Sequence, residues 1–163
     1  MTRAWRRAAM EDVAGISAVA AAVHPSHPER DAVFAERLRL FPQGCRVLAQ
    51  RGIGGYLLSH PWVLGRPPAL DTLIHALPAR PDTFYVHDLA LLPELRGLGH
   101  AGAAVRHAVR LARRLALPTL SLTAVNGTEA FWRRFGFEPH DGPALAAELA
   151  GYGGGAAYMV RAA

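Results

Sequence analysis

The sequence contains no lysine, and all 18 of its basic residues are arginine. This absence excludes a Walker A nucleotide loop, which needs a Gly-Lys-Ser/Thr step. Cysteine is nearly absent too: Cys45 is alone, so it has no partner for an internal disulfide or a paired metal site, which fits a reducing cytoplasm. No segment reaches the ~18 apolar residues of a membrane span, and we expect no membrane partner.

The composition indicates one folded domain over residues 1–163. Hydrophobic residues make up 51% of the chain, enough for a single core. The net charge is +5, but the arginines are scattered rather than aligned in one stripe, and alanine, glycine and proline are abundant. This pattern is typical of a biased composition, so we expect no nucleic-acid partner. A positive field would still favour an anionic ligand.

The segment 84–102, FYVHDLALLPELRGLGHAG, is the most informative part of the chain. An apolar strand over 85–92 runs into a turn at Pro93, and a helix begins in the glycine-rich stretch that follows. Glycines at such a turn let backbone N–H groups converge on one point, and the helix N-terminus adds about half a positive charge. The segment therefore predicts a site for a phosphate or pyrophosphate.

A dinucleotide is one ligand to consider, because Gly97, Gly99 and Gly102 match G-x-G-x-x-G. Three features argue against it. Residues 93–96 separate the strand from the first glycine, and the next strand ends in Asn126 rather than in the acidic residue that holds a ribose. Only 61 residues follow Gly102, too few for the rest of a doubly wound sheet.

Read as Arg96-x-x-Gly99-x-Ala101, the loop resembles the acyl-CoA pyrophosphate loop of the GCN5-related N-acetyltransferases (GNAT). A second block, 126–139, is similar to that family's later motif, in which an Asn at a strand end precedes a short helix that closes on Gly-Phe. The resemblance implies an α/β fold: a central mixed, mostly antiparallel sheet with a splayed parallel strand pair, flanked by about four helices.

The element pattern agrees with that fold. Apolar spacing predicts a helix over 13–23, and Ser26-x-x-Glu29 is a capping box that opens a second helix ending before Pro42. A third helix follows the glycines and ends at Pro118. The stretch 60–82 is a proline-rich loop of the kind that borders substrate sites. Strands are expected over 5–8, 45–50, 55–60, 85–92, 119–125 and 156–160.

The resemblance also implies the residues that bind acetyl-CoA. Backbone groups of Leu89, Ala90 and Leu91 contact the pantetheine arm, and the N–H of Leu91 stabilises the thioester oxygen. Asn126 hydrogen-bonds the pantetheine or, as an alternative, caps the helix after it. Trp132 stands where the family often has a tyrosine acid, so we expect it to be a wall of the acyl pocket. The phosphate loop consists of Arg96, Gly97, Leu98, Gly99, His100, Ala101 and Gly102.

Candidate catalytic residues lie on the same strand. Alternation places Tyr85, His87 and Leu89 on one face and Val86, Asp88 and Ala90 on the other. His87 matches the base of the small-amine branches, and an imidazole suits general-base work near neutral pH. The alternative is that His87 only packs at the centre of the strand and takes no part in catalysis. Asp88 either pairs with an arginine, binds a backbone turn or meets a cationic amine. Tyr152, in a glycine-rich loop, or Tyr85 is the candidate proton donor for the thiolate.

These features predict an acetyl-CoA-dependent N-acetyltransferase that acts on a small primary amine. Two alternatives stay open: a protein or peptide N-terminal acetyltransferase, and a catalytically silent acyl-CoA-binding domain. No histidine spacing indicates a metal site. We expect a cytoplasmic protein, and a homodimer is compatible with the sequence.

Overall fold

The computed structural model describes residues 4–163, in which seven strands form one mixed sheet in the order β1-β2-β3-β4-β5-β7-β6. All neighbouring strands are antiparallel except β4 and β5, which run parallel. This arrangement confirms the predicted fold class. The strands are β1 (Ala4–Arg7), β2 (Cys45–Ala49), β3 (Ile53–Trp62), β4 (Thr83–Leu91), β5 (Thr119–Ala124), β6 (Glu138–Pro139) and β7 (Ala157–Ala162).

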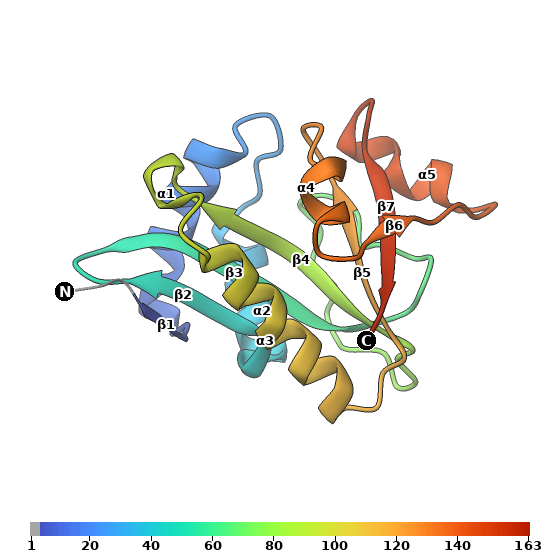
Figure 1. The fold of residues 1–163 in the computed structure, drawn as a ribbon, viewed down its shortest axis with the longest axis horizontal. Coiled ribbons are helices and arrows are strands. Elements are labelled where there is room, and N and C mark those ends of the chain that lie inside the picture. The colour runs from blue at the N-terminus through green and yellow to red at the C-terminus, as the bar shows by residue number, and fades with distance from the viewer. Residues whose placement is uncertain (1–3) are drawn as a thin grey trace.

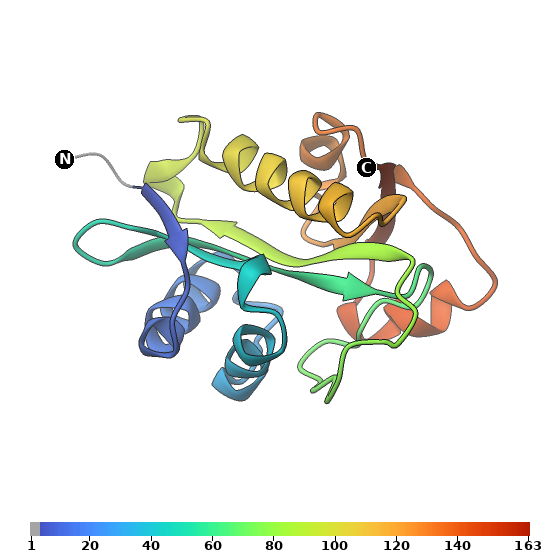
Figure 2. The same ribbon diagram turned by 90° about the horizontal axis from the view of Figure 1, so that it is seen from below.

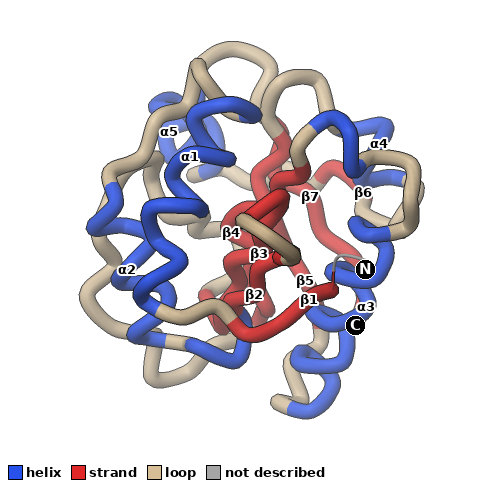
Figure 3. Tube along the Cα trace, turned by 90° about the vertical axis from the view of Figure 1, so that its left-hand side faces the viewer, coloured by secondary structure: helices blue, strands red, loops and turns tan. Residues whose placement is uncertain are grey.

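Helices cover both faces of this sheet. Figures 2 and 3 show α1 and α2 on one face and α3 on the other, with α5 on the α1 side and α4 on the α3 side. The helix predicted over 13–23 is confirmed at both ends. The α-helices of the described chain are α1 (Val13–Val23), α2 (Asp31–Leu40), α3 (His100–Arg114), α4 (Glu129–Arg133) and α5 (Leu145–Leu149). None of its helices is long and apolar enough to cross a membrane.

Each face of the sheet has its own hydrophobic core. On one face the apolar stripe of α3, including Ala108 and Ala112, packs on Phe84, Leu120 and Leu122. On the other face Ile16 and Val19 of α1 and Phe34 of α2 pack on Val47 and Leu58. Cys45 is fully buried in this second core, where burial raises the pKa of its thiol to about 12. The opposite face of α3 exposes Arg106, Arg110, Arg113 and Arg114.

The parallel pair β4 and β5 is joined over only a short stretch. The ladder pairs Phe84 with Leu120, Tyr85 with Ser121 and Val86 with Leu122. Beyond Val86 the two strands part, as Figure 1 shows from their adjacent N-terminal ends and separated C-terminal ends. The edge of β4 that faces β5 is therefore left without a strand partner from His87 onward.

A β-bulge lies at the point where the strands part. Leu58 of β3 pairs with Asp88, and the next residue, Ser59, pairs with Val86, so His87 is the extra residue of β4. The predicted alternation of β4 is wrong for this reason. Val86 packs in the core under α3, whereas Ala90 packs in the core under α1 and α2. The bulge brings His87 and Asp88 to the same side of the sheet.

The predicted capping box at Ser26 is also wrong. Helix α2 begins at Asp31 with Arg30 as its N-cap, after the extended segment that contains Pro28. The Glu29 carboxylate does not fold back onto the helix end. One of its oxygens contacts the ring of His87, and the other accepts the backbone N–H of Asp71. A tertiary ion pair therefore replaces the local cap.

The long loop after β3 is fixed to α2 by charged side chains. The buried Glu36 carboxylate accepts the backbone N–H groups of Ile74 and His75 at 2.7 and 3.0 Å. Its neighbour Arg37 is buried as well and donates to Glu36 and to the carbonyl of Thr72. Charge-assisted hydrogen bonds of this kind hold a loop firmly when buried. The loop thereby places Leu70 beside a cavity that His87 and Asp88 of β4 also line.

His60 of β3 generates a prediction about acid stability. Its ring is buried between Trp62 and Tyr85, and burial lowers the pKa of the imidazole to about 3. Below pH 6.5 the unfolded chain binds a proton here that the native protein does not, so stability falls as the pH drops. From pH 7 to pH 5 this residue alone should remove about 2 kcal/mol of unfolding free energy.

Urea unfolding of the wild type and of His60→Gln at both pH values checks this expectation. The variant should be less stable at pH 7 because a packed ring is lost, but its stability should depend less on pH. An equal loss of stability in both proteins between pH 7 and pH 5 would contradict the assignment.

Candidate functional site

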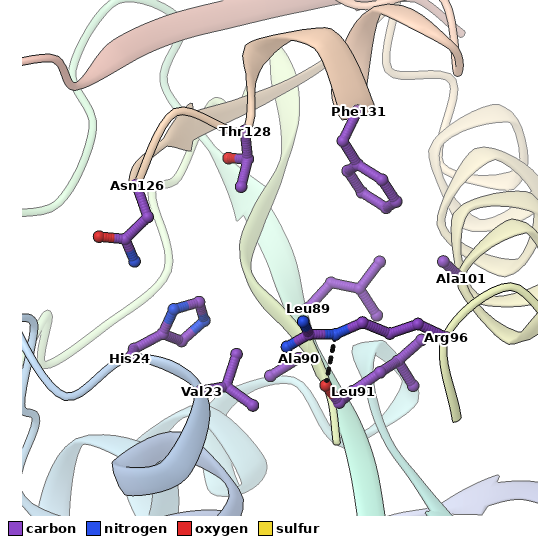
Figure 4. Close-up of a pocket in the computed structure, with 10 residues that line it drawn as sticks. All are labelled: Val23, His24, Leu89, Ala90, Leu91, Arg96, Ala101, Asn126, Thr128 and Phe131. Carbon is purple, nitrogen blue, oxygen red and sulfur yellow. Dashed lines mark hydrogen bonds between the residues drawn. The ribbon is translucent and has the colours of Figure 1, made fainter. Parts of the chain in front are cut away.

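A cavity of about 370 Å³ opens where β4 and β5 part, and we call it the outer cavity. Figure 4 shows its lining, which comes from the end of α1, from β4, from the loop before α3 and the first turn of that helix, and from α4 and the segment before it. The lining residues are Val23, His24, Leu89, Ala90, Leu91, Arg96, Ala101, Asn126, Thr128 and Phe131.

The glycine loop at the start of α3 has the geometry of an anion-binding site. Gly97 and Gly99 adopt φ values of 74° and 84°, which favour glycine, and a Cβ added to either would meet no atom within 4 Å. Gly99 is the N-cap of α3, so the first N–H groups of the helix point out of its end. Arg96 donates to the carbonyl of Leu91 at 3.3 Å and ties the loop to β4. The loop leaves space for a phosphate near backbone donors.

The free edge of β4 supplies further donors. Leu92 donates to the carbonyl of Gly54, which makes this a hydrogen-bonded pair of the antiparallel ladder with β3. Since such pairs alternate, the backbone N–H groups of Leu89 and Leu91 point away from β3 and toward the gap. An extended polar chain lying in the outer cavity would meet them.

Asn126 lies opposite β4 on the other wall of the outer cavity (Figure 4). Its φ of 56° is left-handed, a conformation that Asn tolerates better than most residues. The alternative interpretation of Asn126 as a helix N-cap is wrong, because α4 begins at Glu129 with Thr128 as N-cap. The Thr128 hydroxyl closes that turn by donating to the carbonyl of Val125. The Asn126 side chain is therefore not used in capping.

His24, directly after α1, forms an ion pair that the sequence did not suggest. Its Nε2 lies 2.9 Å from Oδ1 of Asp88, and the hydroxyl of Tyr56 donates to the other oxygen of that carboxylate. The side chains of His24 and Asp88 are 17% and 16% exposed. Asp88 therefore pairs with a histidine and a tyrosine rather than with an arginine.

The two charges of this pair support each other. Burial alone would lower the pKa of the His24 imidazole, but the hydrogen bond and charge of Asp88 outweigh burial and raise that pKa. Burial likewise opposes ionisation of Asp88, yet hydrogen bonds from His24 and Tyr56 hold the pKa of the carboxyl below its usual value. Burial and the nearby carboxylate raise the pKa of the Tyr56 phenol. Near neutral pH Asp88 is thus ionised and Tyr56 is a donor.

His87 lies deeper than His24. Its Nε2 is 2.9 Å from Oε1 of Glu29, and the two side chains are only 2% and 7% exposed. The charge and hydrogen bond of His87 overcome the effect of burial and lower the pKa of Glu29. His87 and Asp88 are neighbours in sequence and lie on one side of the sheet, but each has its own partner.

A smaller cavity of about 40 Å³ lies beside these two pairs, and we call it the inner cavity. A third space, of about 70 Å³, lies between β4 and β5 and also borders His24, His87 and Asp88. Among residues 4–163, only His24 lines all three of these cavities. The inner cavity is lined by His24, His27, Glu29, Leu70, His87, Asp88, Thr123, Val125 and Tyr152.

The two tyrosines expected to donate a proton belong to this inner region. Tyr152 ends a short 3-10 turn, and its hydroxyl donates to the carbonyl of Pro68 at 2.7 Å. The hydroxyl of Tyr85 shares a hydrogen bond of 2.9 Å with that of Thr123. Burial raises the pKa of both phenols. Neither tyrosine lines the outer cavity.

Trp132, expected as a wall of the acyl pocket, is 7% exposed and lines the space between β4 and β5. Its ring packs edge-on against Phe131 and Phe137. The residues that precede α3 are arranged as a surface loop, in which Leu98 is 64% exposed. The carbonyl of His100, the first residue of α3, accepts the Trp5 indole N–H. Within residues 4–163, no group of three or more potential ligands is placed to hold a metal ion.

Sequence comparison places most of the chain in one family. The model of the acetyltransferase (GNAT) family matches residues 18–137, which include the glycine loop and the segment from Asn126 to Phe137. A search of the curated proteins finds no match.

Several solved structures share the fold over nearly the whole of both chains. Naa50 of Arabidopsis thaliana, in complex with the bisubstrate analogue CoA-Ac-MVNAL, has a TM-score of 0.72 at 12% identity, covering 99% of each chain. Rv2747 of Mycobacterium tuberculosis, in complex with CoA and NLQ, has a TM-score of 0.68 at 18% identity, covering 98% of this chain and 99% of that one. The GphF GNAT-like decarboxylase, in complex with isobutyryl-CoA, has a TM-score of 0.73 at 14% identity, covering 98% of each.

At these identities the solved structures establish the fold, and the family match over 18–137 establishes the relationship. The glycine loop at the start of α3, the open edge of β4 and the parting of β4 from β5 are therefore features of a family fold, and the chain belongs to the acetyltransferase (GNAT) family.

Proposed function

We propose that the protein transfers the acetyl group of acetyl-CoA to the primary amine of a small molecule. Each polar part of acetyl-CoA has a matching group of protein donors in or beside the outer cavity. The backbone donors of the loop from Gly97 to Gly102 suit its pyrophosphate. The free edge of β4 suits the polar pantetheine arm, and Asn126 faces that edge from the opposite wall.

Backbone donors also support the acyl-transfer step. The N–H of Leu91 points into the gap, where it would stabilise negative charge on the thioester oxygen as the amine attacks. This N–H group need not reorient during the reaction, because the hydrogen-bond ladder with β3 already fixes its direction. Phe131 borders the outer cavity beside Leu91, and Trp132 borders the adjoining space between β4 and β5, where both rings exclude water.

The observation that supports the small-molecule assignment is a chain of hydrogen bonds beside the inner cavity. Nε2 of His27, in the segment before α2, lies 2.8 Å from the carbonyl oxygen of Tyr152, in the segment before β7. The hydroxyl of Tyr152 in turn donates to Pro68 in the loop after β3. Three distant segments are thus joined beside the inner cavity. A peptide substrate needs an open groove for its following residues, which this connection would obstruct.

The charge of the inner cavity favours an amine. Glu29 and Asp88 border it. Burial opposes their ionisation, but the charge and hydrogen bond of His87 lower the pKa of Glu29, and hydrogen bonds from His24 and Tyr56 lower that of Asp88, so both carboxylates are ionised near neutral pH. Negative charge near the cavity attracts an alkylammonium group. Such a group must lose a proton before it attacks a thioester. His24 and His87, each paired with one of these carboxylates, are the two candidate bases.

An amine panel tests the proposed function. Purified protein is incubated with acetyl-CoA and either small primary amines or short peptides with a free N-terminus, and thiol release is followed. We expect kcat/KM for the best small amine to exceed that for any peptide at least tenfold. Higher values for peptides would identify an N-terminal acetyltransferase, and a lack of turnover with every amine would identify a silent acyl-CoA-binding domain.

Acetyl-CoA binding should depend on the glycine loop. At 100 times its dissociation constant, the ligand should stabilise the protein by about 2.7 kcal/mol, whereas NAD(H) should not stabilise it. Gly99→Asp should abolish this shift in a thermal melt, because it places a side chain and a negative charge among the phosphate donors. Gly155→Asp is the matched control, since Gly155 has the same φ of 84° and equally open surroundings. A retained shift in Gly99→Asp would refute the loop assignment.

The side chain of Asn126 should contribute directly to acetyl-CoA affinity. Asn126→Gly removes the amide but keeps the left-handed backbone, which glycine adopts without strain. Loss of one hydrogen bond worth roughly 1 kcal/mol should weaken the dissociation constant about fivefold, measured by titration calorimetry. An unchanged affinity would show that Asn126 serves only the turn before α4.

A further inference from the structure

We propose that His24 transfers the protons of the acetyl-transfer reaction, with Asp88 and Tyr56 as the residues that position it. This inference rests on the proposed function and deepens it, because it assigns the catalytic base to a residue outside β4. His24 is a catalytic residue in this proposal, and Asp88 and Tyr56 act through it.

The first support is the place of His24 in the fold. It alone, of the residues that the structure describes, borders the outer cavity, the inner cavity and the space between β4 and β5. Figure 4 shows its ring projecting from the end of α1 between Asn126 and β4. An acetyl donor in the outer cavity and an amine in the inner cavity would meet at this ring. His87, at 2% exposure and paired with the equally enclosed Glu29, does not reach the outer cavity.

The second support is the hydrogen-bond geometry of the ring. Because Asp88 is ionised, it can only accept, so Nε2 of His24 carries the proton of the 2.9 Å bond. Tyr56 donates to the second oxygen of Asp88 and holds the carboxylate in place. In the neutral ring the lone pair is then on Nδ1. That atom, like Nδ1 of His87, is buried and has no hydrogen-bond partner among the described residues, but only the His24 ring also lines the outer cavity. A buried nitrogen left unpaired is costly unless it meets a ligand.

The charges around the ring suit a base that must accept a proton from an alkylammonium group. Asp88 on β4 and Glu29 before α2 favour the protonated ring, and Arg96 in the loop before α3 opposes it. Asp88 also faces Tyr56 on β3 and the charge of His87. Burial and Arg96 lower the pKa of His24, but the two carboxylates raise it by more, so that it lies above its ordinary value.

The proton transfers balance as follows. Nδ1 of His24 takes one proton from the substrate ammonium group, and the neutral amine attacks the carbonyl carbon of acetyl-CoA. A C–N bond forms, the C–S bond breaks, and the electron pair of that bond leaves with sulfur as the thiolate. His24 returns its proton to the thiolate. The amide nitrogen releases its own extra proton to water, so that one proton is released per turnover.

This scheme explains how the thiolate receives a proton although position 132 holds a tryptophan in place of the tyrosine acid. The indole N–H of Trp132 does not ionise near neutral pH and cannot serve as the acid. Tyr152 and Tyr85 are engaged with Pro68 and Thr123 away from the outer cavity. His24 lines the outer cavity and becomes protonated in the first step. A single imidazole therefore supplies both the base and the acid.

The test compares four proteins with the best amine of the panel. His24→Gln should lower kcat/KM roughly 10²- to 10⁴-fold, the usual contribution of general acid–base catalysis. Its thermal shift with acetyl-CoA should be retained. The acid limb of its pH–rate profile, which reports the base, should disappear. His107→Gln, at a surface site on α3 that hydrogen-bonds Gln43, is the matched control and should keep wild-type kinetics. His87→Gln should keep the acid limb, with a smaller loss of rate.

Asp88→Asn provides a second variant with a distinct readout. It should lower the rate and move the acid limb to lower pH, because the neutral amide no longer stabilises the His24 imidazolium. A purely structural role would lower the rate without moving the limb. Wild-type kinetics in His24→Gln, or loss of the acid limb in His87→Gln alone, would overturn the proposal. Absence of wild-type turnover with every amine would instead overturn the proposed function, and the role of His24 with it.

Discussion

The extra residue of β4 at His87 is the feature on which the arrangement of the site depends. A regular strand would send His87 and Asp88 to opposite faces of the sheet. The bulge instead brings both to the face covered by α1 and α2, directly after the last residue that pairs with β5. One local irregularity therefore frees the edge of β4 for a ligand and collects ionisable groups beside that free edge. Bulges next to active sites commonly re-aim side chains in this way.

The buried carboxylates explain how the surrounding segments are ordered. A charge placed inside an apolar strand is costly unless donors surround it. Asp88 obtains its donors from β3 and from the end of α1, and Glu29 obtains its donors from β4 and from the loop after β3. The same contacts that satisfy the carboxylates hold four separate parts of the chain around the inner cavity. Binding geometry and local stability thus share the same hydrogen bonds, which makes these positions sensitive to substitution.

The sequence predicts those features of the structure that depend on residues close together along the chain. The helix over 13–23 and the glycine loop follow from spacing and turn chemistry, and the structure contains both. The bulge was not predictable, since it is defined by pairing with β3 and leaves no mark in an apolar run. His24 and Asp88 are 64 residues apart, and no pattern joins them. Glu29 has the spacing of a helix cap, but its carboxylate contacts His87 of the distant strand β4 instead.

The arginine face of α3 has a chemical consequence for an enzyme of this family. Thioesters acylate exposed side-chain amines without any catalyst, and lysine is the residue that supplies such amines. This chain has none, and its surface cations are guanidinium groups such as Arg106 and Arg110, which remain protonated and are poor nucleophiles at cellular pH. Its side chains therefore escape acylation by its own donor. The positive charge of the surface stays constant however much acetyl-CoA accumulates around it.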